Sequence, residues 1–221
     1  MIGRSHALSG LVTGLAVGSF ALREPPGPLV LFAGLVTAYA LAPDLDACGS
    51  TAARSLGFVT EIVAWTVGKV SGGHRHGTHS VAGIAVFTGI AWVACLLRHT
   101  IPGQIALGMI LAAGFVSAVD ALRIGGHLGN LGALAAAAAM TWTGYGLVLV
   151  PVAAALGCAT HLGGDALTRC GVPLLWPVTM REFHATPRRL WFTTGHAAER
   201  WIVTPLLLAA LGLLAWHAVS P

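Results

Sequence analysis

Residues able to bind a metal are concentrated in one short stretch, His74-Arg75-His76-Gly77-Thr78-His79-Ser80. The chain as a whole is 56% hydrophobic and only 9% charged, so a cluster of three imidazoles is unusual in it. Imidazole is the commonest protein ligand for zinc, and its pKa lies near neutrality. The stretch therefore predicts metal binding or proton transfer. A solvated loop that is merely rich in histidine is the alternative.

Two further pairs of metal-ligating residues have informative spacings. His161 and Asp165 are four residues apart, so on a helix they lie one turn apart on the same face and can bind one ion. Asp44 and Asp46 point the same way on an extended segment but diverge on a helix, which would leave only one of them as a direct ligand. Carboxylates beside imidazoles suit zinc, manganese or iron, and more than four ligands would accommodate one or two ions.

The elements that must position these residues are membrane-spanning helices. A mean hydropathy of +0.79 and repeated continuous apolar runs predict a polytopic membrane protein whose spans are helical. We therefore expect an all-α transmembrane bundle of about six to seven spans, forming one domain over residues 1–221. The spans are expected at about 6–22, 29–43, 80–97, 104–122, 129–144, 148–165 and 202–219. Residues 52–70 are interrupted by charges and predict an amphipathic helix in the membrane interface.

This arrangement of spans places the candidate ligands at one membrane face. The residues gathered there are His6, Asp44, Asp46, His74, His79, His161 and Asp165. The same face holds ten of the twelve Lys and Arg residues, leaving Arg23 and Arg98 opposite. By the positive-inside rule this face, with the N-terminus and the site, is cytoplasmic. The net charge of +4 then fits anionic lipid headgroups better than nucleic acid.

Several motifs follow one another along the chain in a recognisable order. They are Pro43-Asp44-Leu45-Asp46, HRHGTHS at 74–80, His161-x-x-x-Asp165, GVPLLWP at 171–177, and Gly195 with Glu199-Arg200. This combination resembles the YdjM-like family of inner-membrane metal-dependent hydrolases. The resemblance implies a multi-pass protein of the inner membrane with His74 and Arg75 beside a metal site. The ligands that it implies are His6, Asp44, His79, His161 and Asp165. The chain departs from the family pattern at Ala47, often histidine there, and at His76, usually glycine.

Residues and resemblance together predict a hydrolase in which metal-activated water attacks a phosphoester or other ester of a lipid-like or amphiphilic substrate. Zinc is the expected ion, with manganese and iron as alternatives. We expect Asp46 to accept the proton of the water, with His74 as the alternative base. Arg75 is expected to bind a phosphoryl group through its guanidinium, and Glu199 to orient a ligand histidine.

Two other classes of protein fit the same residues. One is a non-catalytic metal-binding or metal-transport protein, and the other is a structural membrane protein without a working site. Hydrolysis needs ligands at one end of the bundle with an open coordination position, whereas transport needs polar groups that continue through the spans. The spans contain almost no ionisable residues away from the predicted cytoplasmic face, which favours the hydrolase. No feature of the sequence indicates an oligomeric state.

Overall fold

A computed structural model describes residues 1–219, with only the helical backbone described for residues 218 and 219. In this part of the chain six helices are long and apolar enough to cross a membrane, and there is no sheet. The six are Gly3–Leu22, Pro26–Asp46, Val81–His99, Ile101–Leu122, Leu147–Asp165 and Glu199–His217. The predicted all-α membrane bundle is confirmed. Residues 220 and 221, the end of the predicted domain, lie outside the described residues.

The helices follow the predicted spans closely. The α-helices are α1 (Gly3–Ala16), α2 (Pro26–Tyr39), α3 (Thr51–Arg54), α4 (Phe58–Val70), α5 (Val81–Leu96), α6 (Ile101–Leu122), α7 (Gly126–Thr143), α8 (Val150–Asp165) and α9 (Thr204–Val219). The π-helical turns are η1 (Val17–Leu22) and η7 (Glu199–Val203). The short 3-10 turns are η2 (Ala42–Asp46), η3 (Gly77–His79), η4 (Leu97–His99), η5 (Leu147–Leu149) and η6 (Arg188–Leu190).

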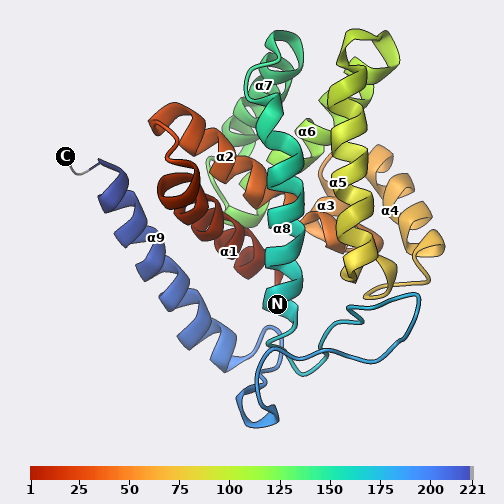
Figure 1. Cartoon of the computed structure of the whole chain (residues 1–221), viewed down its shortest axis with the longest axis vertical. Helices are drawn as coiled ribbons and strands as arrows, with labels where there is room; N and C mark the ends of the chain where they lie inside the picture. Colours follow the sequence, from red (N-terminus) through yellow and green to blue (C-terminus); the bar gives the residue numbers. More distant parts are fainter. Residues whose placement is uncertain (220–221) are drawn as a thin grey trace.

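Helix α8 runs through the middle of the bundle and contacts α1, α2 and α5 (Figure 1). Helix α9 lies at the edge and contacts α1, and its C-terminal end points away from the N-terminus. The irregular segment after α8, residues 166–198, covers the end of the bundle at which α8 ends and the chain begins. We call this end the loop end.

Helix α7 completes the path of the chain between α6 and α8. Arg123, just after α6, lines a hollow with Gly3 and Thr51, and His161 near the end of α8 touches His6. Both helices therefore finish at the loop end, so the segment between them must return along the bundle. Helix α7 makes this return packed on α6. It is rich in alanine and is not among the six helices that are long and apolar enough to cross a membrane, although the sequence pattern predicts a span at residues 129–144.

Residues 52–70 form two helices where the sequence pattern predicts one interfacial helix. Helices α3 and α4 are separated by a turn at residues 55–57, in which Gly57 has a φ of 61°. Leu56 in this turn lines one hollow together with Gly108 and Met109 of α6. The helix pair therefore reaches inward beside α6. Its two ends remain near the loop end, where α4 contacts η2.

Glycine allows the helices that carry the candidate ligands to approach one another closely. A Cβ atom at Gly14 of α1 would lie 2.6 Å from the Cα atom of Ala33 in α2. A Cβ atom at Gly157 of α8 would lie 2.8 Å from the backbone nitrogen of Ala40. Packing of small residues is what associates helices in lipid. It brings α1 and α8 against α2, and the contact at Gly157 lies one helical turn from His161.

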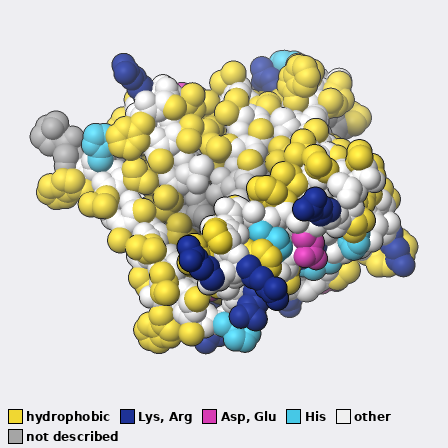
Figure 2. All heavy atoms as spheres, turned by 60° about the horizontal axis from the view of Figure 1, so that its bottom comes forward, with side chains coloured by type: hydrophobic (Ala, Val, Ile, Leu, Met, Phe, Trp, Pro, Cys, Tyr) yellow, Lys and Arg dark blue, Asp and Glu magenta, His cyan; other side chains and the backbone are white. Residues whose placement is uncertain are grey.

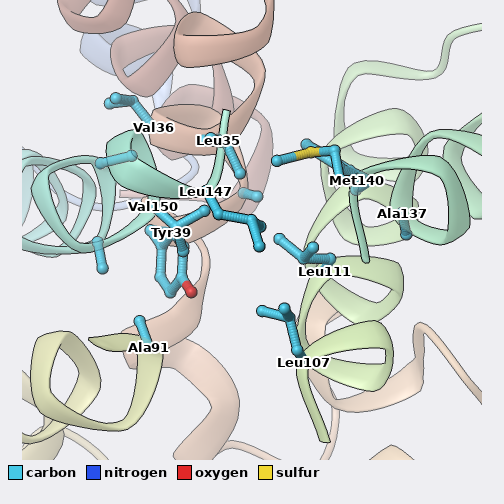
Figure 3. Packing of buried hydrophobic residues seen from close by; sticks show 14 of the residues in the cluster. Leu35, Val36, Tyr39, Ala91, Leu107, Leu111, Ala137, Met140, Leu147 and Val150 are labelled. Atoms are coloured by element: carbon cyan, nitrogen blue, oxygen red, sulfur yellow. The ribbon is translucent and has the colours of Figure 1, made fainter. Parts of the chain in front are cut away.

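A buried apolar cluster joins α2, α5, α6, α7 and α8 above the loop end. Figure 3 shows side chains of α2, including Leu35 and Tyr39, facing Leu107 and Leu111 of α6, with Met140 of α7 alongside. This packing fixes the helices whose ends carry the polar residues described next.

Candidate metal centre

Five predicted metal ligands meet at the loop end. They are His6 of α1, Asp44 of η2, His79 of η3, and His161 and Asp165 of α8. The three histidine side chains are fully buried, and Asp165 is 1% exposed. So many ionisable groups are rarely buried together without a partner that balances them. The cluster therefore has the burial and the residue types of a metal site.

Four ligand atoms converge on one point. Nε2 of His79 lies 3.2 Å from Nε2 of His161, and Oδ1 of Asp44 lies 3.7 Å from each of these nitrogens. Oδ2 of Asp165 lies 3.7 Å from the first nitrogen and 3.8 Å from the second. A tetrahedral zinc ion, with ligand distances of about 2.0–2.2 Å, keeps its ligand atoms roughly 3.3–3.6 Å apart. The five separations lie within about 0.2 Å of this range, so the two imidazoles can share one divalent ion with either carboxylate.

Both histidine rings are held so that Nε2 faces this point. Nδ1 of His161 lies 2.8 Å from the carbonyl oxygen of Ala40, which can only accept, so Nδ1 carries the proton and Nε2 has a free lone pair. Nδ1 of His79 lies 2.9 Å from the Thr78 hydroxyl and 3.4 Å from a carboxylate oxygen of Asp46. Partners of this kind fix the orientation of metal-binding imidazoles. The sequence did not point to Ala40, because a backbone carbonyl leaves no residue signature.

Asp46 holds the histidine-rich loop in place. Its Oδ1 lies 2.7 Å from Nδ1 of His74, and its Oδ2 accepts from the backbone N–H of Arg75 at 3.0 Å and from the Thr78 hydroxyl. The backbone of Arg75 is left-handed, with a φ of 63°, which is unfavourable for a residue other than glycine. The bond from its N–H to the buried carboxylate supports this conformation. Asp44 and Asp46 thus approach His79 at different ring nitrogens.

His6 has unused hydrogen-bonding capacity within the cluster. Its ring stacks on that of His161 with centroids 3.6 Å apart, and its Nε2 lies 3.3 Å from Oδ1 of Asp165. Nδ1 of His6 has no hydrogen-bond partner, although the ring is fully buried, and Nε2 approaches only the Asp165 carboxylate. Buried polar atoms are nearly always satisfied, so the unpartnered Nδ1 fits a site for a ligand. His6, beside His161 and Asp165, and His74, beside Asp44 and His79, could each supply a fifth ligand to the ion or bind a second ion.

Arg75 places a guanidinium at the edge of the cluster. One of its terminal nitrogens lies 2.7 Å from Oδ2 of Asp165, while the other is buried without a partner. Arg75 is about 20% exposed, and the neighbouring His74 is about 48% exposed. These two residues therefore connect the buried ligands to the surface of the loop end.

His79 is the ligand outside the spanning helices, and its protonation is set by two opposing effects. Burial lowers the pKa of His79, but the carboxylates of Asp44 and Asp46 outweigh burial and raise this pKa to about 9. Without a metal, His79 is then cationic at neutral pH. An ion must displace this proton to bind Nε2, because only neutral imidazole is a ligand.

Glu199 contacts backbone groups and not the ligand histidine for which the sequence suggested it. Its two carboxylate oxygens accept from the N–H of Ile2 at 2.8 Å and from the N–H of Gly195 at 2.6 Å. The amino group of Met1, next to Ile2, contacts Asp165. Glu199 thereby ties the segment that leads into His6 to the start of α9.

The GVPLLWP motif packs against the histidine-rich loop. The N–H of Val81 donates to the carbonyl of Leu174 at 3.0 Å, and the ring of Trp176 lies against Gly77. This contact explains why two motifs almost a hundred residues apart belong to the same site. Figure 2 shows the loop end, where Lys and Arg side chains gather around His and acidic side chains.

Fold and site together define a multi-pass helical membrane protein with a buried histidine and aspartate cluster. The family model of the YdjM inner membrane proteins matches residues 1–220, so the chain belongs to this family. The resemblance inferred from the motifs is confirmed, and the family name agrees with a location in the inner membrane. No curated protein and no solved structure matches the chain.

Proposed function

We propose that this protein is a metal-dependent hydrolase that cleaves a phosphoester or other ester of an amphiphilic substrate at the cytoplasmic face of the inner membrane. The observation that carries the proposal is the convergence of ligand atoms from His79, His161, Asp44 and Asp165. The two imidazole nitrogens lie 3.2 Å apart, and each lies 3.7–3.8 Å from both carboxylate oxygens. Two imidazoles with two carboxylates suit zinc, and manganese or iron as alternatives. A bound divalent ion lowers the pKa of water toward about 7 and polarises the oxygen of the bond that breaks.

His74 is the residue best placed to move a proton. Its Nδ1 donates to Asp46 at 2.7 Å, so Nε2 is the free acceptor, and the ring is half exposed. One of its ring nitrogens lies within 4.8 Å of ligand atoms of Asp44 and His79. Asp46, which the sequence analysis favoured as the base, has both oxygens engaged by donors. We therefore assign proton transfer to His74 and positioning of the loop to Asp46.

Arg75 is the group for binding the substrate headgroup. Its unpartnered terminal nitrogen supplies N–H donors at the edge of the metal centre, where a phosphoryl oxygen can accept them. A guanidinium matches two oxygens of a phosphoryl group at once, which favours a phosphoester over an uncharged ester. The surrounding basic side chains of the loop end favour the same anionic class of substrate (Figure 2).

Metal transport is the second candidate function, and the distribution of buried charge argues against it. Among residues 1–217 the buried acidic and histidine side chains are His6, Asp46, His79, His161, Asp165 and Glu199. All of them lie at the loop end. A transport path needs polar groups that continue across the membrane. In the other half of the bundle the described core is apolar.

The experiment is a hydrolysis assay on a panel of lipid phosphoesters, using protein in nanodiscs with and without a chelator. Chelator-sensitive product release is expected, with His74→Gln retaining metal but losing rate. Glu182→Gln is the matched control, because Glu182 is 64% exposed and approaches only His184, outside the cluster. Metal binding without release of any product by the wild type would leave the transport or metal-storage function as the better explanation.

A further inference from the structure

An apolar cavity of about 430 Å³ lies between α2, α4, α5 and α6. Its wall includes Leu35 of α2, Val63 of α4, Ile90 of α5 and Met109 of α6. On α6 the lining runs from Ala106 to Ser117, about 16 Å at a rise of about 1.5 Å per residue. The cavity is therefore long in the direction of the helices. Its volume lies within the range of about 300–1,000 Å³ that is typical of ligand pockets.

One polar group in the wall lacks a partner. The hydroxyls of Thr60 and Ser117 are satisfied, because Thr60 donates to Gly57 at 3.1 Å and Ser117 donates to Ala113 at 2.6 Å. The hydroxyl of Tyr39 has no hydrogen-bond partner, although Tyr39 is only 7% exposed. Figure 3 shows this hydroxyl directed away from α2, on the side of Ala91, which also lines the cavity. The hydroxyl oxygen is itself closed off by protein, so the accessible wall of the cavity is apolar and recognises a ligand by its apolar part.

The cavity and the metal centre share one turn of the chain. Ala42 and Leu45 of η2 line the cavity, while Asp44 and Asp46 of the same turn contact the histidines. Tyr39 lies directly before this turn, at the end of α2. The polar group of a ligand in the cavity is therefore placed near the metal centre, and its apolar part extends toward the start of α6.

The side of the cavity is open to the surroundings of the helices. Val63, Ile90 and Met109 line it and are 41%, 51% and 41% exposed. In a membrane these surfaces face lipid, so a chain can enter sideways from the bilayer. An apolar cavity of about 150 Å³ already holds one benzene molecule, so about 430 Å³ suits a single hydrocarbon chain.

We propose that this cavity binds one acyl chain of the amphiphilic substrate, with the polar end of that chain at the turn η2, which also carries Asp44. The inference rests on the proposed function for the role of the bound molecule. It adds the substrate class, an acyl ester whose headgroup carries a phosphate, and the residues that recognise the chain.

The test uses a monoacyl glycerophosphate that carries a photoreactive diazirine in its chain, in nanodiscs of phosphatidylcholine with a chelator present so that nothing is cleaved. Ala113→Phe fills the cavity from α6. Ala112→Phe is the matched control, because Ala112 is equally half-buried but lines the hollow toward α7. Adducts are expected on Val63 and Met109, with labelling at least about fivefold lower in Ala113→Phe than in Ala112→Phe.

Tyr39→Phe is a second control, which keeps the ring and removes only the hydroxyl. Because this hydroxyl has no protein partner and is closed off from the cavity, the variant should fold and be labelled like the wild type. Equal labelling of Ala113→Phe and Ala112→Phe overturns the proposal. Because the assay needs no turnover, labelling without hydrolysis refutes only the proposed function. A hydrolysis rate that does not depend on the acyl chain of the substrate refutes only the acyl site.

Discussion

Replacing Asp46 by asparagine separates the two roles that aspartates have in this cluster. Asp46 supplies none of the four converging ligand atoms. It contacts His79 at Nδ1 and holds His74 and the backbone of the histidine-rich loop. Asp165 supplies one of the converging oxygens itself. Asp46→Asn should therefore weaken metal binding without abolishing it, whereas Asp165→Asn should remove a ligand.

The size of the Asp46→Asn effect follows from its donors. Asparagine keeps one acceptor oxygen, so it cannot serve His74 on one side and both Arg75 and Thr78 on the other. Losing one hydrogen bond to a charged group costs about 1.5–3 kcal/mol. Removing the carboxylate behind a metal-binding histidine typically weakens metal affinity about 10- to 100-fold. We expect this range for zinc, with saturation still reached at high concentration.

The assay is competition for zinc against a chromophoric chelator, on protein purified in mild detergent. Asp165→Asn should bind at least about tenfold more weakly than Asp46→Asn, because an amide oxygen is a poorer zinc ligand than a carboxylate. Glu182→Gln, an exposed carboxylate outside the cluster, should match the wild type. An unchanged affinity in Asp46→Asn, or a smaller loss in Asp165→Asn than in Asp46→Asn, would refute the assignment.

Three further predictions concern charge, recognition and topology. The pKa of His79 is raised from 6.5 to about 9. Its contribution to the stability of the metal-free protein is therefore full below pH 6.5 and is lost as pH rises through about 9. Thermal unfolding of chelator-treated protein, measured across this pH range, should show the loss. The apparent zinc affinity should rise by up to about tenfold per pH unit below pH 9. An affinity that does not change with pH would contradict this prediction. Arg75→Lys should keep its metal but lose at least about tenfold in kcat/KM for a phosphoester, and wild-type kinetics would show that the guanidinium does not bind the headgroup. A reporter fused at Gly27 should lie on the side opposite the cytoplasm and one fused at Ala185 in the cytoplasm, and the reverse pattern would place the site on the other face.

The path of the helices could be predicted from the sequence because span length and apolar composition are properties of single segments. The same reasoning brings His6, Asp44, His79, His161 and Asp165 to one end, since each lies at or near the end of a predicted span. The break between α3 and α4 could not be predicted in this way. Gly57 is its only local signal, and the position of Leu56 depends on α6.

Contacts within the site were less accessible to sequence reasoning. The carbonyl of Ala40 orients His161 because α8 packs closely on α2 at Gly157, which is a tertiary effect. Asp46 was assigned from its neighbour Asp44, but its donors come from a loop about thirty residues later in the chain. Glu199 contacts the backbone of Ile2, at the other end of the sequence. Such partners become visible only when the helices have been packed.

Metal content of the purified protein tests the account most directly. Elemental analysis after mild detergent extraction and loading with zinc or manganese should give one to two equivalents for the wild type. The double variant His161→Ala with Asp165→Asn should retain less than about one-tenth of an equivalent, because two of the four converging ligands are gone. Less than about one-tenth of an equivalent in the wild type after loading would contradict the metal centre.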